Sequence, residues 1–232
     1  MRAPARRIAV PLLAFALAAP AATAHADPPS TGGTSAPPPA AAIIATPHVL
    51  VGKVGRFRGS FPPRAAGRTV MIERFDDDTA AWTHVTTAQV RADGSYVARW
   101  RTDVTGRHRT RATVAGEAAR SAGGGAAVFA AAQPEEASMT VYRSAVASWY
   151  GPGFYGRRTA CGERMTRKLL GVAHKRLPCG TEVALSYGRR SITVPVVDRG
   201  PFVKGRRWDL TAATAKALHF TFTDRIGAVR IG

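Results

Sequence analysis

The sequence predicts an all-β protein made of two units, a β-sandwich followed by a small closed β-barrel with one short helix. Three observations support this prediction. Short segments in which apolar and polar residues alternate recur from about residue 43 onward, and a period of two is the strand period. The 23 glycines and 16 prolines indicate many turns and argue against a helical bundle. A single run, Thr211 to Leu218, combines a capping residue with helix-favouring alanines.

The composition limits the number of domains and the kinds of site that the chain can form. A chain of 232 residues allows one large domain or two small ones, and 45% hydrophobic residues exclude wholesale disorder. Two cysteines exclude a disulfide-dense miniprotein and a zinc site of the usual cysteine kind. We therefore expect no metal and no cofactor. After the first 30 residues no apolar run reaches the length of about 20 residues that a membrane span needs.

The N-terminus has the features of an export signal. Arginines occur among residues 2–7, an apolar stretch follows from Ile8 to about Thr23, and Ala24-His25-Ala26 has the small-x-small pattern of a cleavage site. This predicts a signal peptide over residues 1–26, cleaved after Ala26, and a mature protein that is secreted or in the cell envelope without a stable membrane anchor. A transmembrane anchor is the alternative, but the stretch is short and contains two prolines.

The charge is strongly positive, with 33 Lys+Arg against 15 Asp+Glu and a formal net charge of +18. An anionic partner is one interpretation, and plain solubility is the other. Nucleic acid is the usual partner of a basic protein, but export makes it a poor candidate here. Anionic wall polymers are the expected polyanions outside the cell.

The first half of the mature chain predicts a linker and then the sandwich. Residues 27–42 are proline-rich and predict an unfolded linker. Five alternating segments separated by turn signals follow over residues 43–132, in an order that resembles immunoglobulin-like or fibronectin-like modules. The histidines of residues 43–132 are scattered and form no catalytic pattern. Asp76 to Asp78 are expected to form a solvated turn, with a calcium site as the alternative. Residues 133–140 predict an interdomain linker.

Residues 141–232 predict the barrel. The helix at Thr211 to Leu218 belongs to this unit, and about six short strands with one helix in ninety residues are typical of a small closed barrel. The strand candidates in this region are Ser144–Trp149, Leu170–Ala173, Glu182–Tyr187, Ser191–Val197 and Ile226–Ile231.

Four segments of this region resemble a known family, the rare lipoprotein A family of double-psi β-barrels. They are ASWYGPGFYGRRTACGE (147–163), AHKRLPCGT (173–181), VDRGPFVKGR (197–206) and WDLTAATAKAL (208–218). The resemblance covers essentially all of residues 144–232. The chain differs from the family in lacking the lipid-anchor cysteine and in carrying a sandwich in front of the barrel, instead of the common C-terminal peptidoglycan-binding repeat.

The resemblance implies a peptidoglycan lytic transglycosylase. Such an enzyme cleaves between N-acetylmuramic acid and N-acetylglucosamine without water, because the muramic 6-hydroxyl attacks its own anomeric carbon and leaves a 1,6-anhydro end. One carboxyl group that gives a proton and then takes one suffices for this chemistry. The alternatives are a non-catalytic, expansin-like protein that binds or loosens the wall, and a structural or septal protein with an inactive barrel.

Two aspartates compete for the role of the acid. Asp198 ends an apolar strand, where partial burial would raise its pKa, and Arg199 would face the other way if the strand continues. The alternative is a purely structural role, in which Asp198 only caps the following turn. Asp209 is the rival acid, and its own alternative is a residue whose charge suits the helix start.

Two further residues match functional positions of the family. His174 is expected to orient Asp198 or to bind a sugar hydroxyl, although a lone histidine after a strand is often structural. Glu163 is expected to place the acetamido group or the 6-hydroxyl of the substrate.

Substrate-binding candidates lie mainly in a loop rich in glycine and proline. Trp149, Tyr150, Phe154 and Tyr155 offer flat faces on which sugar rings pack, with core packing as the alternative for Trp149. Basic residues could attract muramic carboxylates or wall phosphates. The basic candidates are Arg157, Arg158, Lys175 and Arg199.

Cys161 and Cys179 are the only cysteines. Export places them where disulfides persist, and we expect them to form one across a separation of 18 residues. The alternatives are two free buried thiols or a half-built metal site with His174.

Overall fold

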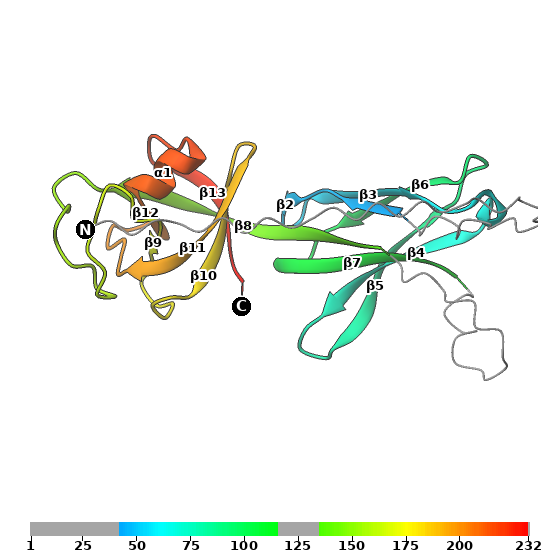
Figure 1. The fold of residues 1–232 in the computed structure, drawn as a ribbon, viewed down its shortest axis with the longest axis horizontal. Helices are drawn as coiled ribbons and strands as arrows, with labels where there is room; N and C mark the ends of the chain where they lie inside the picture. The colour runs from blue at the N-terminus through cyan, green and yellow to red at the C-terminus, as the bar shows by residue number, and fades with distance from the viewer. Residues whose placement is uncertain (1–41, 116–134, 232) are drawn as a thin grey trace, which may run out of the picture. The chain divides into compact units, whose positions relative to one another are not determined.

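The computed structural model describes residues 42–115 and 135–231. The predicted signal peptide, its cleavage site and all but the last residue of the predicted 27–42 linker lie outside the described residues. Within the described ranges the chain is almost entirely β-structure, as the sequence predicts (Figure 1). No helix in these ranges is long and apolar enough to span a membrane.

The first part of the fold consists of two sheets that share one core. Strands β1, β3 and β6 form a three-stranded antiparallel sheet, whereas β4, β5 and β7 join the first half of β8. β2 pairs in parallel with the same half of β8. The bounds are β1 Ala42–Ala45, β2 His48–Leu50, β3 Val54–Ser60, β4 Thr69–Asp76, β5 Ala81–Gln89, β6 Ser95–Arg101, β7 Gly106–Val114 and β8 Glu136–Tyr150, with a short 3-10 helix at Pro63–Ala65.

The alternation in the sequence places one face of each strand in this core. Phe57 and Trp100 of the three-stranded sheet lie in the same buried cluster as Ile72 and Val141 of the other sheet. In β3 the residues on either side of Phe57 are exposed arginines. The two layers therefore bury their apolar faces against each other, which is the sandwich packing that the period-two pattern predicts.

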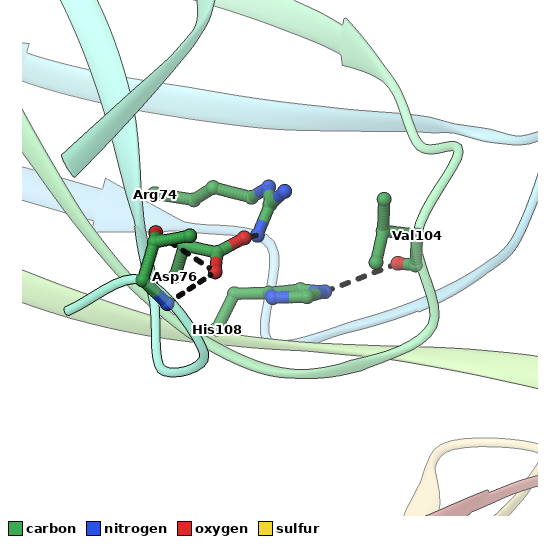
Figure 2. Close-up of polar contacts among 5 residues, drawn as sticks. Arg74, Asp76, Val104 and His108 are labelled. Atoms are coloured by element: carbon green, nitrogen blue, oxygen red, sulfur yellow. Dashed lines mark hydrogen bonds and ion pairs between the residues drawn. The ribbon is translucent and has the colours of Figure 1, made fainter. Parts of the chain in front are cut away.

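The acidic turn after β4 is a hydrogen-bonded turn, as expected. Asp76 Oδ1 accepts bonds from the backbone N–H and the hydroxyl of Thr79, and Arg74 pairs with Asp76 Oδ2 at 3.1 Å (Figure 2). The Thr79 backbone N–H is the main cause of the lowered pKa of Asp76. His108 lies nearby and donates from Nε2 to the Val104 carbonyl, so it too has a structural partner.

β8 differs from the sequence-based expectation. Residues 133–140 were predicted to be a linker, but β8 already begins at Glu136 and pairs with β7 from Arg111↔Glu136 onward. The second half of β8 then pairs with β13 and β12. Small and polar residues in this stretch suggest a linker locally, but ladder hydrogen bonds to a distant strand override that local preference.

The second part of the fold is a closed barrel of six strands and one helix. Pairing runs from β8 to β13, β10, β11, β9 and β12, and then from β12 back to β8, which closes the barrel. Two of these pairings, β12–β8 and β11–β9, are parallel. The bounds are β9 Val172–Ala173, β10 Glu182–Tyr187, β11 Arg190–Asp198, β12 Trp208–Thr211, α1 Ala212–Leu218 and β13 Asp224–Arg230.

Two details of the barrel depart from the sequence-based expectation. The strand predicted at Leu170–Ala173 is shortened to Val172–Ala173, and the sequence did not single out β12 as a strand. Four residues directly before a helix carry too little periodicity to stand out, and β12 is held by pairing on both sides. The helix itself begins as predicted, because the Thr211 side chain accepts from the Thr214 N–H.

Candidate active site

One row of side chains across three neighbouring barrel strands brings the two competing aspartates together. Asp198 on β11 and Asp209 on β12 are both register partners of Ala173 on β9, and Asp209 is also the partner of Ser148 on β8. Residues directly opposite each other in a ladder point to the same face. The β11 register is irregular between Val196 and Asp198, and the two carboxyl groups are close enough for the charge of Asp198 to raise the pKa of Asp209.

Asp198 is half-buried and its carboxyl group accepts three hydrogen bonds. Oδ1 accepts from the backbone N–H groups of Ala160 and Arg199, each at 2.8 Å, and Oδ2 accepts from the Tyr150 hydroxyl at 3.1 Å. The bond from the Arg199 backbone N–H is a local contact of the kind expected if Asp198 caps the following turn. The Ala160 bond ties the long loop after β8 to the end of β11.

Asp209 has a different environment. Ser148, a buried residue, donates its hydroxyl to Oδ1 at 2.8 Å, and Oδ2 has no partner among the described residues. Burial raises the pKa of Asp209, and the charge of Asp198 raises it further, while the Ser148 bond and Arg206 oppose this. The sequence expected burial to raise a pKa at Asp198. In the structure it is the rival acid, Asp209, that the parallel β12–β8 pairing partly buries against β8.

Tyr150 connects the carboxylates of the site. Burial raises its pKa, and the nearby charges of Asp198, Asp209 and Glu163 raise it further, so its hydroxyl stays protonated. Glu163 is exposed, and its Oε2 accepts from the hydroxyl of the buried Thr159. The charges of three of the four residues proposed as catalytic from the sequence therefore act on this phenol, and Asp198 alone is hydrogen-bonded to it.

His174 does not orient the Asp198 carboxyl group with its side chain. Its Nδ1 accepts from the backbone N–H groups of Arg176 and Leu177, and its ring lies 4.5 Å from that of Trp208. Only its backbone N–H reaches Asp198, at the carbonyl oxygen. Burial, followed by the charge of Arg207, lowers the pKa of His174, which favours the neutral ring with its proton on Nε2.

The predicted disulfide is confirmed. Cys161 and Cys179 are bonded, with their Cα atoms 5.6 Å apart. The Arg199 guanidinium lies against this bridge, with Nη2 3.2 Å from Cys179 Sγ, and it makes no ion pair with Asp198. The sequence-based expectation that Arg199 and Asp198 point apart agrees with this arrangement. The bridge fixes the loop directly next to Ala160, whose N–H binds Asp198.

The aromatic residues at the end of β8 and in the loop after it are partly exposed. Trp149 is 38% exposed and donates from its indole N–H to the Thr221 carbonyl, so it is not a core residue. Phe154 packs edge-on against Tyr150, with Arg157 stacked over it, while Arg167 lies over Tyr155. Phe202, to which the sequence argument assigned no role, is 82% exposed in the loop after Asp198.

Basic residues approach the same end of the barrel from several segments. Lys175 follows β9, and Arg206 and Arg207 immediately precede β12. The sequence argument identified Lys175 but missed the two arginines, whose only signal was their place just before the Trp-Asp-Leu motif. Among the described residues no three His, Cys, Asp or Glu side chains are grouped so that they could hold a metal ion.

Residues 142–231 match the family model described as lytic transglycolase. The resemblance recognised in the barrel sequence is thereby confirmed, and the closed six-stranded barrel is consistent with the double-psi type. Over this region the chain is similar to proteins named as endolytic peptidoglycan transglycosylases RlpA.

Three of these relatives show the extent of the similarity. The chain is 48% identical over 87 residues to the probable transglycosylase of Synechocystis sp., which is 36% of this chain and 27% of that protein. It is 48% identical over 79 residues to the probable enzyme of Aquifex aeolicus, covering 33% and 35%. It is 45% identical over 75 residues to the enzyme of Campylobacter jejuni, covering 32% and 27%. The chain thus spans about a third or less of the length of the curated relatives it matches.

Proposed function

We propose that this protein is a peptidoglycan lytic transglycosylase that produces 1,6-anhydromuramic ends. The observation that supports the proposal most directly is the row that sets Asp198 and Asp209 on either side of Ala173. The barrel similarity to endolytic peptidoglycan transglycosylases supplies the substrate class. A carboxyl group with a raised pKa and a free oxygen is the group that this reaction needs.

Asp209 fits the proton-donor role better than Asp198, the acid favoured from the sequence. Protonated Asp209 gives its proton from Oδ2 to the glycosidic oxygen as the bond from that oxygen to the muramic anomeric carbon breaks. The muramic 6-hydroxyl oxygen then bonds to the anomeric carbon and releases its proton to the Asp209 carboxylate. No water is consumed, and the carboxyl group returns to its initial state.

Asp198 and Glu163 supply negative charge next to this centre. An oxocarbenium-like transition state carries positive charge at the sugar ring, and a nearby carboxylate stabilises it. Asp198 also fixes the Tyr150 hydroxyl and the Ala160 loop, which form one wall of the site. Tyr150, Tyr155, Trp149 and Arg157 are then the residues that bind the sugar chain.

Mass spectrometry of digested glycan strands tests this function. The wild-type protein should yield 1,6-anhydromuramic ends, and Asp209→Asn should lower the rate by about 10²–10⁴-fold, the usual contribution of a general acid. Ser148→Ala removes only the hydrogen bond to Asp209 and should retain most of the rate. If the wild type binds strands but releases no anhydro ends from either naked or native glycan, the expansin-like alternative replaces this proposal.

We further propose that the protein acts in the cell envelope after cleavage behind Ala26.

We also propose that its sandwich is an immunoglobulin-like module that binds anionic wall polymers. The outer face of the three-stranded sheet supports this binding. Arg56 and Arg99 are cross-strand partners there, and Arg58 and Arg101 are their neighbours. Like charges directly opposite each other are destabilising, so a polyanion would relieve the repulsion.

No outward-facing residue of this sheet is acidic, and the side chains of Arg56, Arg58 and Arg99 make no hydrogen bond or ion pair within the described ranges. Binding of immobilised poly(glycerol phosphate) tests the idea. The triple substitution of these three arginines to Gln should weaken binding at least tenfold. A matched variant with Arg189, Arg190 and Arg164 changed to Gln loses the same charge and should bind nearly as the wild type does. Equal losses in both variants would contradict the proposal.

The two parts are also proposed to fold separately, with the boundary near residue 140. The barrel pairings of β8 begin at Arg143, so a fragment of residues 140–232 keeps every strand of the barrel. This fragment should unfold cooperatively in urea. A fragment that is insoluble or lacks a cooperative transition would contradict independent folding.

A further inference from the structure

A basic cavity lies on the barrel beside the candidate active site. It has a volume of ≈ 510 Å³ and includes Ala145 and Val146 of β8 in its lining. Every other lining residue except Gly205 is basic or a histidine, and no carboxylate is among them. These residues are His174, Lys175, Arg176, Arg206, Arg207 and Arg225.

The positive charge of this cavity is not neutralised within the described part of the chain. Lys175, Arg176 and Arg207 are exposed, and neither their side chains nor that of Arg206 has a hydrogen-bond or ion-pair partner there. Only Arg225 is held, through bonds from its guanidinium to Ser144. Several cations that converge without an ion-pair partner repel one another, and a bound anion would offset that repulsion.

His174 adds an oriented donor to the same cavity. Its Nδ1 already accepts from two backbone N–H groups, so the neutral ring carries its proton on Nε2. Nε2 has no partner in the described residues, and none of their fully buried side-chain nitrogens lacks one. Nε2 is therefore accessible, and it can donate to a ligand in the cavity that His174 lines.

The cavity follows the same strands as the catalytic row. Arg207 precedes Asp209 by two positions, and Lys175 follows Ala173 by two positions. Because β12 and β9 are antiparallel, both residues lie in the same direction from the row. Two residues of fully extended chain span at most about 7 Å, so Lys175 and Arg207 lie within about that distance of the row. Arg206 is close enough for its charge to lower the pKa of Asp209. On the proposed function, a group bound here belongs to a sugar at or next to the cleaved bond.

We propose that this cavity is a subsite for a carboxylate carried by the muramic acid residue next to the scissile bond. The inference rests on the proposed function for the identity of the strand. Muramic acid is the sugar of that strand that carries such groups. The carboxylate has two possible sources, the lactyl group of a muramic residue without a stem peptide, or the carboxylates of the stem peptide itself. Lys175 and Arg207 bind it through charge-assisted hydrogen bonds, and His174 Nε2 donates a third.

Strand binding tests the proposal independently of cleavage. All proteins carry Asp209→Asn so that no turnover occurs, and calorimetry at about 0.15 M salt screens distant charges. The probes are purified peptide-free strands, the same strands with their lactyl carboxylates converted to methylamides, and strands with intact stem peptides. The cavity variant is Lys175→Gln with Arg207→Gln. The control, Arg189→Gln with Arg190→Gln, removes the same charge from an exposed turn away from the cavity.

The cavity variant should bind a carboxylate-bearing strand at least tenfold more weakly than the control does, as expected for the loss of charged hydrogen bonds. A loss confined to peptide-free strands, absent with the methylamide strands, assigns the lactyl carboxylate. A loss confined to stem-bearing strands assigns the stem peptide. Equal affinity of cavity variant and control for every strand overturns the proposal, even if the wild-type protein cleaves strands normally.

The two substituted side chains are exposed, so both variants should keep the wild-type urea midpoint. If the double variant does not fold, Lys175→Gln and Arg207→Gln are measured singly, and each should weaken binding several-fold. An enzyme that releases no anhydro ends but still shows the carboxylate-dependent loss would retain the subsite and refute only the proposed function.

Discussion

Removing the bridge between Cys161 and Cys179 should lower both the stability of the barrel and the order of its active-site loop. The bond closes a loop of 18 residues. The chain-entropy model gives a loop of this length about 3 kcal/mol of the free energy of unfolding. This is a large share of the roughly 5–15 kcal/mol that stabilises a typical domain. The bridge also anchors the chain next to Ala160, whose N–H binds Asp198, so removing it should disturb the pair of aspartates.

Urea unfolding with and without a reductant measures this contribution. With an m-value of about 1–3 kcal/mol/M, a loss of 3 kcal/mol moves the midpoint by about 1–3 M. Trp208, only 4% exposed in the barrel core, provides a fluorescence signal for the barrel. The Cys161→Ala, Cys179→Ala double variant should be as weak as the reduced wild type and insensitive to reductant. A change in the free energy of unfolding below about 1 kcal/mol, or two reactive thiols in the unreduced unfolded chain, would refute the reasoning.

Three further predictions concern Asp198, Asp209 and the strand between them. If protonated Asp209 is the acid, the basic limb of the pH–rate profile reports its pKa, which burial and then the charge of Asp198 raise. Asp198→Asn should therefore move the basic limb of the pH–rate profile to lower pH, as measured on the residual activity of that variant. If Asp209→Asn keeps the wild-type basic limb, Asp198 is the acid instead. A raised folded-state pKa also means that ionised Asp209 costs stability as the pH rises above its ordinary value of 3.8. Asp209→Asn should thus be more stable than the wild type in urea at pH 7, with the difference vanishing below about pH 3.8, and an equal or lower midpoint at pH 7 would contradict this. Gly171→Ala should cost about 1–3 kcal/mol of the free energy of unfolding, because a Cβ there would clash with the methyl groups of Val197. Unchanged thermal unfolding would show that the backbone before β9 yields without strain.

The order of residues along the chain determined much of this protein. Alternation of apolar and polar residues fixed which faces of the strands are buried, as in β3 around Phe57. The Thr211 cap and the alanines after it fixed the one helix. Four collinear motifs carried the family resemblance that the match over residues 142–231 bears out, and the expectation of export predicted that the two cysteines pair. All of these signals are local or depend only on residue identity.

Only the tertiary structure decided which residues meet. The pairing of β12 with both β8 and β9 closes the barrel and sets Asp209 between Ser148 and Ala173. It also buries Asp209, and this burial raises the pKa of its carboxyl group. Lys175 and Arg207 lie 32 positions apart in the sequence, yet they line one cavity. Desolvation and charge clustering depend on distances through space, and long-range strand pairing sets those distances without leaving a periodic trace in the sequence.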